Sequence, residues 1–201
     1  MTAADQQPLI SLLQEYRDVF AFGREEMADI APTVMEHRLN VDPLHRPVVQ
    51  KNRYMGLERV AAANAKVQKL LKVGFILECQ YSEWIFNVVL AKKPNGTWRM
   101  CVDFMDLNKA CPKDSYPLPK IDKVVDATAG HALLSFMDAF SEYHQIPLCP
   151  DDQEKTAFIM DRGLYCYKMM SFNLKKHWSH LSALRRQIVR APYWENYGGL
   201  R

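Results

Sequence analysis

Residues 133–146 read Leu133-Leu134-Ser135-Phe136-Met137-Asp138-Ala139-Phe140-Ser141-Glu142-Tyr143-His144-Gln145-Ile146, so that an apolar run ends at the carboxylate of Asp138. We interpret residues 133–137 as a core strand. A carboxylate at the exit of such a strand is costly to desolvate unless it is capped, paired or bound to a cation. This stretch alone leaves two interpretations open. Asp138 either N-caps a helix that begins at Ala139, since aspartate is a favoured cap, or it binds a cation.

Composition and cysteine usage narrow the class of protein. The chain has 201 residues, 48% of them hydrophobic, which is enough for a sizeable core in one domain or one and a half. It has no run of about 18 apolar residues, and its start lacks the basic and apolar regions of a secretory signal, so we expect no membrane span. The five cysteines are dispersed without a Cys-x-x-Cys pair, which favours reduced thiols in a cytoplasmic or nuclear protein.

The net charge of +3 is unevenly distributed. Residues 175–201 contain six Lys or Arg against one acid, whereas the other residues contain 20 basic and 22 acidic side chains. The positive excess therefore lies in the tail. A near-neutral body can still bind nucleic acid through a local basic groove, so the total charge neither supports nor excludes such a partner.

Helix patterns dominate the first third of the chain. Apolar residues recur at helical spacing from Leu9 to Phe20 behind Pro8, a good first-turn residue. Scattered prolines then predict an extended connector. Residues 57–73 form a second amphipathic helix pattern, which Gly74 ends.

Strand patterns follow in two pairs. Residues 87–91 and 97–104 flank the hairpin signal Pro94-Asn95-Gly96, and alternation places Arg99 and Asp103 on the polar face of the second strand. Prolines then exclude regular structure until a short helix from about residue 120 to residue 129. The second pair of strands comprises residues 155–159 and 165–170, with a turn at residues 161–163.

Four motifs follow one another along the chain: Trp98-Arg99-Met100-Cys101-Val102-Asp103-Phe104-Met105-Asp106-Leu107-Asn108-Lys109, Tyr116-Pro117-Leu118-Pro119, Leu134-Ser135-Phe136-Met137-Asp138 and Tyr143-His144-Gln145-Ile146. In this order and spacing they closely resemble a reverse transcriptase, in particular the polymerase of gypsy-type LTR retrotransposons of plant genomes. The resemblance covers roughly residues 9–175. It implies an α/β (α+β) fold, the fingers and an incomplete palm of a right-hand polymerase, with antiparallel strands and packed helices. It divides the chain into an N-terminal helix and extended connector (1–56), fingers (57–132), a partial palm (133–174) and an off-pattern basic tail (175–201).

The resemblance implies template-directed nucleotide addition, with an RNA/DNA primer-template and deoxynucleoside triphosphates as partners. In this family two Mg²⁺ ions held by carboxylates activate the primer 3′-oxygen and stabilise the leaving pyrophosphate. By resemblance Asp138 is the first catalytic, metal-binding carboxylate of the palm. The backbone of Ala139 and Phe140 would lie against the triphosphate, and Tyr143 would abut the sugar and disfavour a 2′-hydroxyl.

Basic residues of the predicted hairpin resemble the triphosphate-binding residues of the fingers. Arg99 matches an arginine that grips the incoming triphosphate, a role that suits a planar guanidinium. Either Lys92 or Lys93 matches the accompanying lysine, and the sequence leaves the choice open. Asp103 is expected to orient neighbouring basic groups rather than to bind metal. Without the resemblance, a surface ion pair at Arg99 and solvated lysines in a turn would be the simpler interpretations.

Three departures from the family pattern bear on activity. Glu142 stands where the family has glycine, and Ser171 and Asn173 replace a proline and a glycine of the family's Met-Pro-Phe-Gly-Leu segment. The Tyr-x-Asp-Asp hairpin, which carries the other two catalytic carboxylates, is absent from the 201 residues, and Asp151-Asp152 belongs to a different segment. We therefore expect a truncated, inactive polymerase fragment. The alternatives are a non-catalytic protein that retains primer-template or nucleotide binding, and a relic without activity.

The tail suggests a shifted reading frame after about residue 175. With suitable codons, one DNA sequence encodes the family segment Gly-Lys-Thr-Met-Glu-Val-Tyr-Val-Asp. Read in the frame that starts two nucleotides further along, the same DNA encodes Glu-Asn-Tyr-Gly-Gly-Leu-Arg, followed by a stop codon. The chain ends Glu195-Asn196-Tyr197-Gly198-Gly199-Leu200-Arg201. On this hypothesis the charge of the tail is incidental. The competing interpretation is a basic nucleic-acid-binding appendage whose stacking groups are Trp178, Tyr193, Trp194 and Tyr197.

Overall fold

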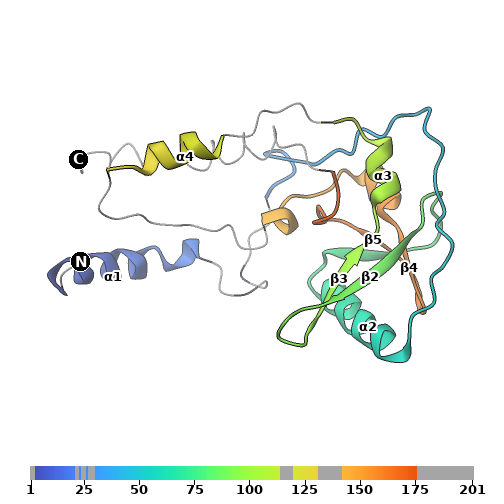
Figure 1. Cartoon of the computed structure of the whole chain (residues 1–201), viewed down its shortest axis with the longest axis horizontal. Coiled ribbons are helices and arrows are strands. Elements are labelled where there is room, and N and C mark those ends of the chain that lie inside the picture. Colours follow the sequence, from blue (N-terminus) through green and yellow to red (C-terminus); the bar gives the residue numbers. More distant parts are fainter. Residues whose placement is uncertain are drawn as a thin grey trace.

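The computed structural model describes residues 3–20, 23, 26, 30–113, 120–130 and 142–175. Its centre is a five-stranded sheet of order β1-β5-β4-β2-β3 (Figure 1). The strands are β1 (Ile76–Cys79), β2 (Phe86–Lys92), β3 (Trp98–Val102), β4 (Phe158–Met160) and β5 (Gly163–Tyr167). Neighbouring strands are antiparallel except β2 and β4, which are parallel. The expected mixed α/β class is confirmed, with one parallel pair that the sequence did not predict.

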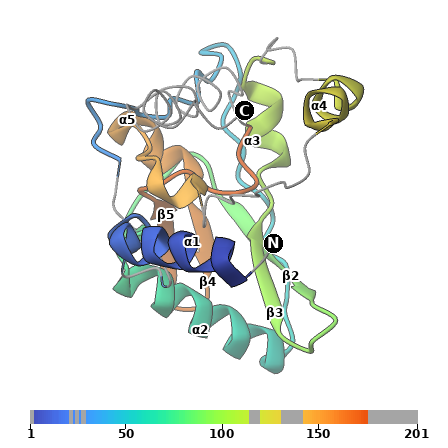
Figure 2. The same cartoon turned by 90° about the vertical axis from the view of Figure 1, so that its left-hand side faces the viewer.

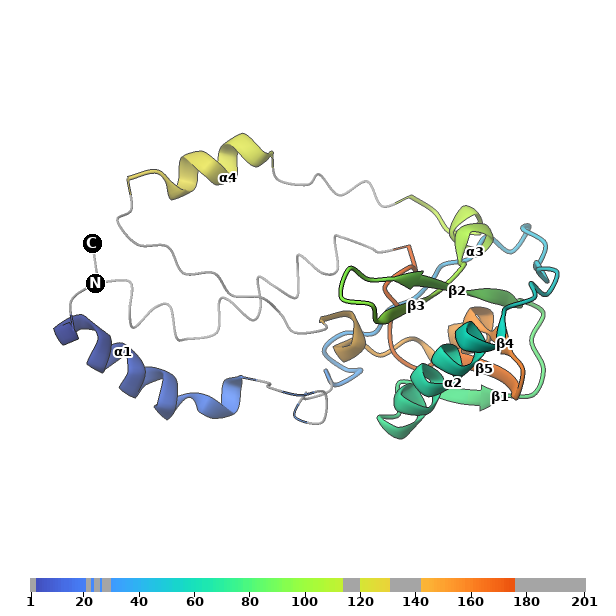
Figure 3. The ribbon, with the colours of Figure 1, turned by 60° about the horizontal axis from the view of Figure 1, so that its bottom comes forward.

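The helices are unevenly placed around this sheet. α2 (Leu57–Lys72) buries Ala63, Val67 and Leu70 against the strands, and Gly74, at a φ of 73°, follows its end as expected. In Figure 2, α2 lies at the opposite end of the molecule from α3 (Met105–Ala110) and α4 (Ile121–Thr128). α1 (Ala3–Glu15) and α4 stand away from the sheet, as Figures 1 and 3 both show. Among the described residues, no helix has the length and apolar character needed to cross a bilayer.

Short helical turns complete the described elements. They are η1 (Arg17–Val19), η3 (Glu142–Gln145), α5 (Pro150–Gln153) and η4 (Glu154–Thr156). η3 and α5 precede β4, and η4 leads directly into it. These three turns therefore return the chain to the sheet, where β4 pairs with β2.

A row of aromatic rings forms the centre of the core. Phe86 and Phe104 meet edge-on with ring centroids 5.2 Å apart, and Tyr167 lies 6.2 Å from Phe104 and 5.6 Å from Phe158. All four side chains are buried. Such ring pairs contribute about 0.5–1.5 kcal/mol beyond the area that they bury. These ring contacts hold Phe104, which follows β3, against Tyr167 of β5.

The connector of residues 30–56 is irregular, as predicted, but it is tied to the sheet region. Its His37 forms an isolated bridge with Leu148, and Val49 forms another with Ile85. The side chain of Leu39 is buried in the same core as the strands. The connector is therefore part of the folded body.

The first helix differs from the sequence expectation at both ends. It begins at Ala3 rather than behind Pro8, so Pro8 lies inside it, and it ends at Glu15 rather than at Phe20. The alanines and glutamines before Pro8 are good helix formers, and a proline near a helix start removes few backbone hydrogen bonds.

The expected strand over residues 155–159 begins only at Phe158. Lys155 and Thr156 lie in η4 instead, because the Thr156 hydroxyl donates to the carbonyl of Gln153 at 2.7 Å and accepts the N–H of Tyr167 at 2.9 Å. β5 correspondingly begins at residue 163 and ends at residue 167. β1 and α3 were not predicted at all.

Candidate functional site

A cavity of about 610 Å³ lies between α2, the β2–β3 hairpin and the loop that follows β5. Among the described residues, five cationic side chains line it and no carboxylate does. The cations are Lys66, Lys69 and Lys72 of α2, Lys93 of the hairpin turn and Arg99 of β3. A concave surface lined by one sign of charge focuses the electrostatic potential and attracts ions of the opposite sign. This cavity is therefore suited to a polyanion.

The hairpin holds Arg99 and Lys93 in place through its turn. The N–H of Lys93 donates to the carbonyl of Thr97 at 2.8 Å, and Gly96 adopts a φ of 79° that favours glycine. The Asn95 side chain accepts the Thr97 hydroxyl at 2.7 Å. The predicted hairpin is thus confirmed, and it presents two of its cations to one cavity.

The structure separates the two lysines between which the sequence could not choose. Lys93 lines the cavity with Arg99. The ammonium of Lys92 instead lies 5.7 Å from the centroid of the Trp98 ring, and the guanidinium of Arg59 lies at the same distance from that ring. A cation over an aromatic face gains about 0.5–1 kcal/mol at an exposed site and more where the pair is desolvated, and Trp98 is half-buried. Lys92 is therefore engaged in packing, and Lys93 is the lysine that shares a cavity with Arg99.

Tyr143 lies next to this cavity without lining it. Its half-buried ring meets Phe172 edge-on, with centroids 5.8 Å apart, and packs beside Ile146 and Met170. Phe172 lines the cavity, and 60% of this side chain is exposed. The neighbour His144 also lines the cavity and stacks on a core ring. The Tyr143 segment and the Phe172 segment are therefore in contact, although the sequence separates them.

The loop of residues 171–175 is joined to the end of β3. The side-chain amide of Asn173 donates to the carbonyl of Val102 at 3.0 Å, and that of Asn108 donates to the carbonyl of Asn173 at 2.8 Å. Among the described residues only Asn40 is a non-glycine with a left-handed φ, so the backbone at Asn173 does not require glycine. Asn173 replaces the family's glycine and takes a structural role.

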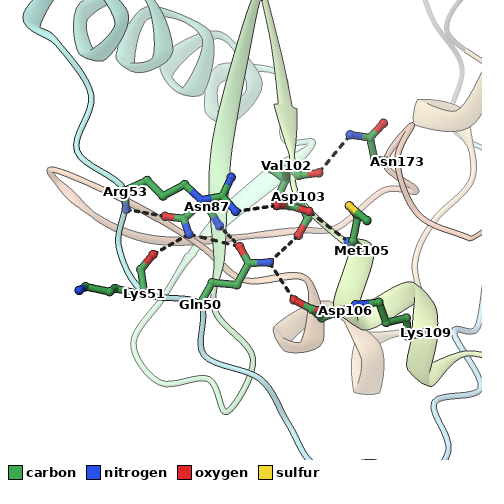
Figure 4. A network of polar contacts seen from close by, with 10 residues as sticks. All are labelled: Gln50, Lys51, Arg53, Asn87, Val102, Asp103, Met105, Asp106, Lys109 and Asn173. Carbon is green, nitrogen blue, oxygen red and sulfur yellow. Dashed lines mark hydrogen bonds and ion pairs between the residues drawn. The ribbon is translucent and has the colours of Figure 1, made fainter.

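A second polar cluster joins the connector to the end of β3 (Figure 4). The buried Asn87 accepts the N–H of Arg53 at 3.0 Å, and Gln50 donates to the carbonyl of Asp103 and to the carboxylate of Asp106, both at 3.2 Å. The carboxylate of Asp103 forms an ion pair with Arg53 at 3.4 Å. Asp103 thus contacts a basic side chain, as expected. The exposed guanidinium limits this pair to about 0–1 kcal/mol.

The carboxylate of Asp106 in this cluster also lies beside Lys109. The hydrogen bond from Lys109, at 2.8 Å, and then that from Gln50 lower the pKa of the Asp106 carboxyl. The same contact with Asp106 raises the pKa of Lys109. These shifts belong to a local network at the start of α3.

The Asp151-Asp152 pair has a structural role in its second member. Asp152 is buried at 6% exposure. One carboxylate oxygen accepts the N–H of the buried Leu39 at 2.8 Å, and the other pairs with Lys155 at 2.6 Å. Asp152 therefore anchors the connector to α5.

Three predicted site residues, Asp138, Ala139 and Phe140, lie outside the described residues. Within the described ranges, no group of three or more His, Cys, Asp or Glu side chains is placed to hold a metal ion. The described ranges therefore do not by themselves supply a magnesium site.

Comparisons with known proteins agree with the motifs. Residues 91–187 match the sequence model of the family described as "Reverse transcriptase (RNA-dependent DNA polymerase)". The "Retrovirus-related Pol polyprotein from transposon 412" of Drosophila melanogaster is 31% identical over 173 residues, which are 83% of this chain and 14% of that protein. This chain belongs to the reverse transcriptase domains of transposon polyproteins. The "Transposon Tf2-3 polyprotein" of Schizosaccharomyces pombe is 26% identical over 181 residues, 90% of this chain and 14% of that protein.

Solved reverse transcriptases share the fold. The "foamy viral protease-reverse transcriptase in complex with RNA/DNA hybrid" has a TM-score of 0.73 at 16% identity, covering 94% of this chain and 25% of that one. The native "Prototype Foamy Virus Protease-Reverse Transcriptase" has a TM-score of 0.71 at 17% identity, covering 96% and 26%. The chain therefore has a reverse transcriptase fold. It spans about 14% of the length of its curated relatives.

Sequence reasoning missed the three lysines of α2. Lys66, Lys69 and Lys72 recur every third residue, which places them on one side of the helix. That spacing was the available signal, but a lysine row on an amphipathic helix is ordinarily its solvated face. Only the folded structure shows that this side borders the same cavity as Arg99.

Proposed function

We propose that this chain is the fingers (57–132) and a partial palm (133–174) of an RNA-directed DNA polymerase, and that its basic cavity binds a deoxynucleoside triphosphate. The observation that carries the proposal is the convergence of Arg99, Lys93 and Phe172 on one cavity whose described lining contains no carboxylate. A planar guanidinium can grip phosphate oxygens through two parallel hydrogen bonds, and the ammonium adds a point charge. The chain belongs to the reverse transcriptase family, and nucleotide addition by that family is a phosphoryl transfer that needs such contacts with the triphosphate.

The palm residues complete the proposed site. We assign to Asp138 the role of catalytic carboxylate and Mg²⁺ ligand, to the backbone of Ala139 and Phe140 contact with the triphosphate, and to Tyr143 contact with the sugar. The contact between Tyr143 and Phe172 supports the last assignment, because Phe172 lines the cavity. Reverse transcriptases generally use divalent metal ions, and in phosphoryl transfer these ions neutralise developing charge.

The 201-residue polypeptide is proposed to bind nucleotide and an RNA/DNA primer-template without extending the primer. Two-metal catalysis needs several carboxylates around the ions, and the 201 residues contain no Tyr-x-Asp-Asp sequence. The carboxylate of Asp152, in the only Asp-Asp pair of the sequence, is engaged by Leu39 and Lys155. Binding without turnover is thus the function that the cavity supports best.

Primer extension on an RNA template, with Mg²⁺ and all four deoxynucleotides, tests the absence of turnover. We expect no extended primer from the purified chain. Magnesium-dependent extension that Asp138→Asn abolishes would refute this part of the proposal.

Calorimetric titration with dTTP tests binding. Arg99→Gln is expected to weaken binding roughly tenfold or more, because a charge-assisted hydrogen bond is worth about 1.5–3 kcal/mol. Arg162→Gln is the matched control, since Arg162 is an exposed arginine on the turn between β4 and β5. Equal affinities of the two variants would refute the assigned role of Arg99.

We also propose a finer origin, a gypsy-type LTR retrotransposon of a plant-like genome, and a cytoplasmic or nuclear location. The motif spacing supports the first, and the five free thiols support the second. Genomic DNA past the codon of Lys175 is expected to encode the Tyr-x-Asp-Asp hairpin in another frame. Its absence from all frames there would refute the shifted-frame hypothesis.

A further inference from the structure

The side-chain amide of Asn108 holds the loop of residues 171–175 at two points. Its NH₂ group donates to the carbonyl of Asn173 at 2.8 Å, and its oxygen accepts the N–H of Lys175 at 2.7 Å. An asparagine amide is both donor and acceptor, so one half-buried side chain pairs with two backbone groups of the loop. Asn108 therefore fastens the loop backbone to α3.

The loop makes further bonds back to α3 and to β3. The ammonium of Lys175 donates to the carbonyl of Asn108 at 3.0 Å and to that of Cys111. These carbonyls lie at the C-terminal end of α3, where a helix leaves its last carbonyls without internal partners and favours a cation. The Asn173 amide donates to the carbonyl of Val102, at the end of β3, at 3.0 Å (Figure 4). We call Asn108, Asn173 and Lys175 the loop clamp.

The loop clamp connects two walls of the basic cavity. Arg99 lies three residues before Val102 on β3, and Phe172 is the residue before Asn173 on the loop. Both Arg99 and Phe172 line the cavity, whereas Asn108 lies outside its described lining. Since 60% of the Phe172 side chain is exposed, its position depends largely on the backbone of the loop. The loop clamp therefore sets the spacing between the strand of Arg99 and the loop of Phe172.

Support of α3 does not account for the Asn108 side chain. The helix has six residues, and the Lys175 ammonium already binds carbonyls at its C-terminal end. Both side-chain bonds of Asn108 go to the loop and neither goes to α3. Its contribution is therefore to the place of the loop.

We propose that Asn108 is a positioning residue for nucleotide binding, which acts by holding Phe172 at a fixed spacing from Arg99. In a nucleotide the base and the triphosphate are covalently joined. An aromatic ring that stacks on the base and a guanidinium that grips the phosphates must therefore stand at a matching distance. Holding both groups in place before binding removes an ordering cost that would lower affinity. The inference rests on the proposed function, since it concerns the same cavity.

Calorimetric titration of Asn108→Ala with dTTP tests the inference on the full chain. The change removes both bonds to the loop and does not weaken α3, because alanine is the better helix former. Losing one hydrogen bond shifts a two-state equilibrium by about two- to twelvefold, and the apparent affinity falls with the fraction of chains whose loop is in place. We therefore expect dTTP binding to weaken about fivefold or more.

Asn64→Ala is the matched control. It makes the same change on another helix, α2, and removes a hydrogen bond of the same kind, which the Asn64 amide donates to the Asp161 carboxylate at 3.1 Å. Asn64 lies outside the described lining of the cavity, so its variant should bind dTTP like the wild type.

Two readouts separate positioning from general stabilisation. If Asn108 acts through Phe172, Asn108→Ala should weaken binding by a clearly smaller factor in a Phe172→Leu background than in the wild type. Hydrogen exchange at the Leu174 amide, which donates to the Ser171 carbonyl and not to Asn108, should be faster in Asn108→Ala. A merely structural residue would lower the urea midpoint and leave the affinity of the folded chain unchanged.

The outcomes distinguish this inference from the proposed function. If Arg99→Gln weakens dTTP binding while folded Asn108→Ala binds like the wild type, the inference is overturned and the proposed function stands. Fully additive effects of Asn108→Ala and Phe172→Leu would also overturn the inference, because the two residues would then act independently. Should Asn108→Ala not fold, Asn108→Asp takes its place in each comparison, since it keeps the size and the acceptor but cannot donate to Asn173. If the wild type does not bind dTTP, both proposals fall.

Discussion

Replacing Asp152 with alanine tests whether this carboxylate is structural. The change removes the acceptor of the Leu39 N–H, which is buried, and the partner of Lys155. An unsatisfied buried donor costs about 1–3 kcal/mol, and breaking a buried ion pair costs about 3–5 kcal/mol. Because the Lys155 side chain keeps 35% of its exposure, it can turn to water and recover part of the second cost. We therefore expect a loss of about 2–4 kcal/mol in the free energy of unfolding.

Urea unfolding followed by tryptophan fluorescence measures this loss. With an m-value of about 2 kcal/mol per molar urea, the midpoint should fall by about 1–2 M at unchanged m. Asp151→Ala is the control, since Asp151 is its exposed neighbour and should change stability by no more than about 0.5 kcal/mol. Equal midpoints for the two variants would show that Asp152 is not an anchor. The dTTP affinity of folded Asp152→Ala should match the wild type, and a selective loss of binding would instead place Asp152 in the functional site.

Three further predictions concern local contacts. The lowered pKa of Asp106 contributes stability that is present above the unfolded value of about 3.9 and is lost as pH falls through the folded value, so Lys109→Met should flatten the acid side of a stability–pH profile; an unchanged profile would contradict the assigned contact. Burial raises the pKa of Cys166 to about 12, so at about pH 8 iodoacetamide should leave it unmodified until urea unfolds the chain, as mass spectrometry of peptides would show. Asn173→Gly, which restores the family residue, should cost about 1–2 kcal/mol in urea unfolding because it removes the bond to Val102 and adds backbone entropy to the unfolded state; a gain in stability would contradict this account.

The elements that sequence could predict carry their signals locally. α2 has an apolar period and a glycine stop, and the observed helix ends within one residue of the expected end. The β2–β3 hairpin has alternating strands around Asn95-Gly96, and the observed turn lies there. In both cases the residues that decide the structure lie within one short window, so no distant partner is needed.

The elements that sequence missed depend on distant partners. β1 has only four residues, and its ladder partners lie on β5, from Leu164 to Tyr167. α3 has six residues, too few for a helical period, and its Asn108 is held by the loop of residues 171–175. The parallel contact of β2 with β4 likewise joins segments that local patterns cannot relate. Short elements whose stability comes from tertiary contacts leave little local signal.

The residues of the candidate site also fall into those that the sequence could predict and those that it could not. Arg99 and the pair Lys92 and Lys93 could be proposed from motif resemblance, but the choice of Lys93 required the cavity lining and the contact of Lys92 with Trp98. The α2 lysines belong to no motif, and the position of their helix beside β3 depends on the whole fold. Sequence resemblance thus finds residues that share a motif, whereas an electrostatic site assembled from unrelated segments appears only after folding.

The same division underlies the proposal that this chain binds nucleotide without turnover. The five cations of the cavity come from α2, the hairpin turn and β3, whose positions are fixed by the aromatic core, by the hairpin and by the Asn173 contact with Val102. All of these supports lie within the described residues. The proposed phosphate binding therefore depends on elements within the described residues, whereas turnover would depend on carboxylates that must meet around metal ions. Asp138→Asn should accordingly weaken dTTP binding in the absence of divalent metal far less than Arg99→Gln does, and an equal loss would show that Asp138 and the cations act as one unit.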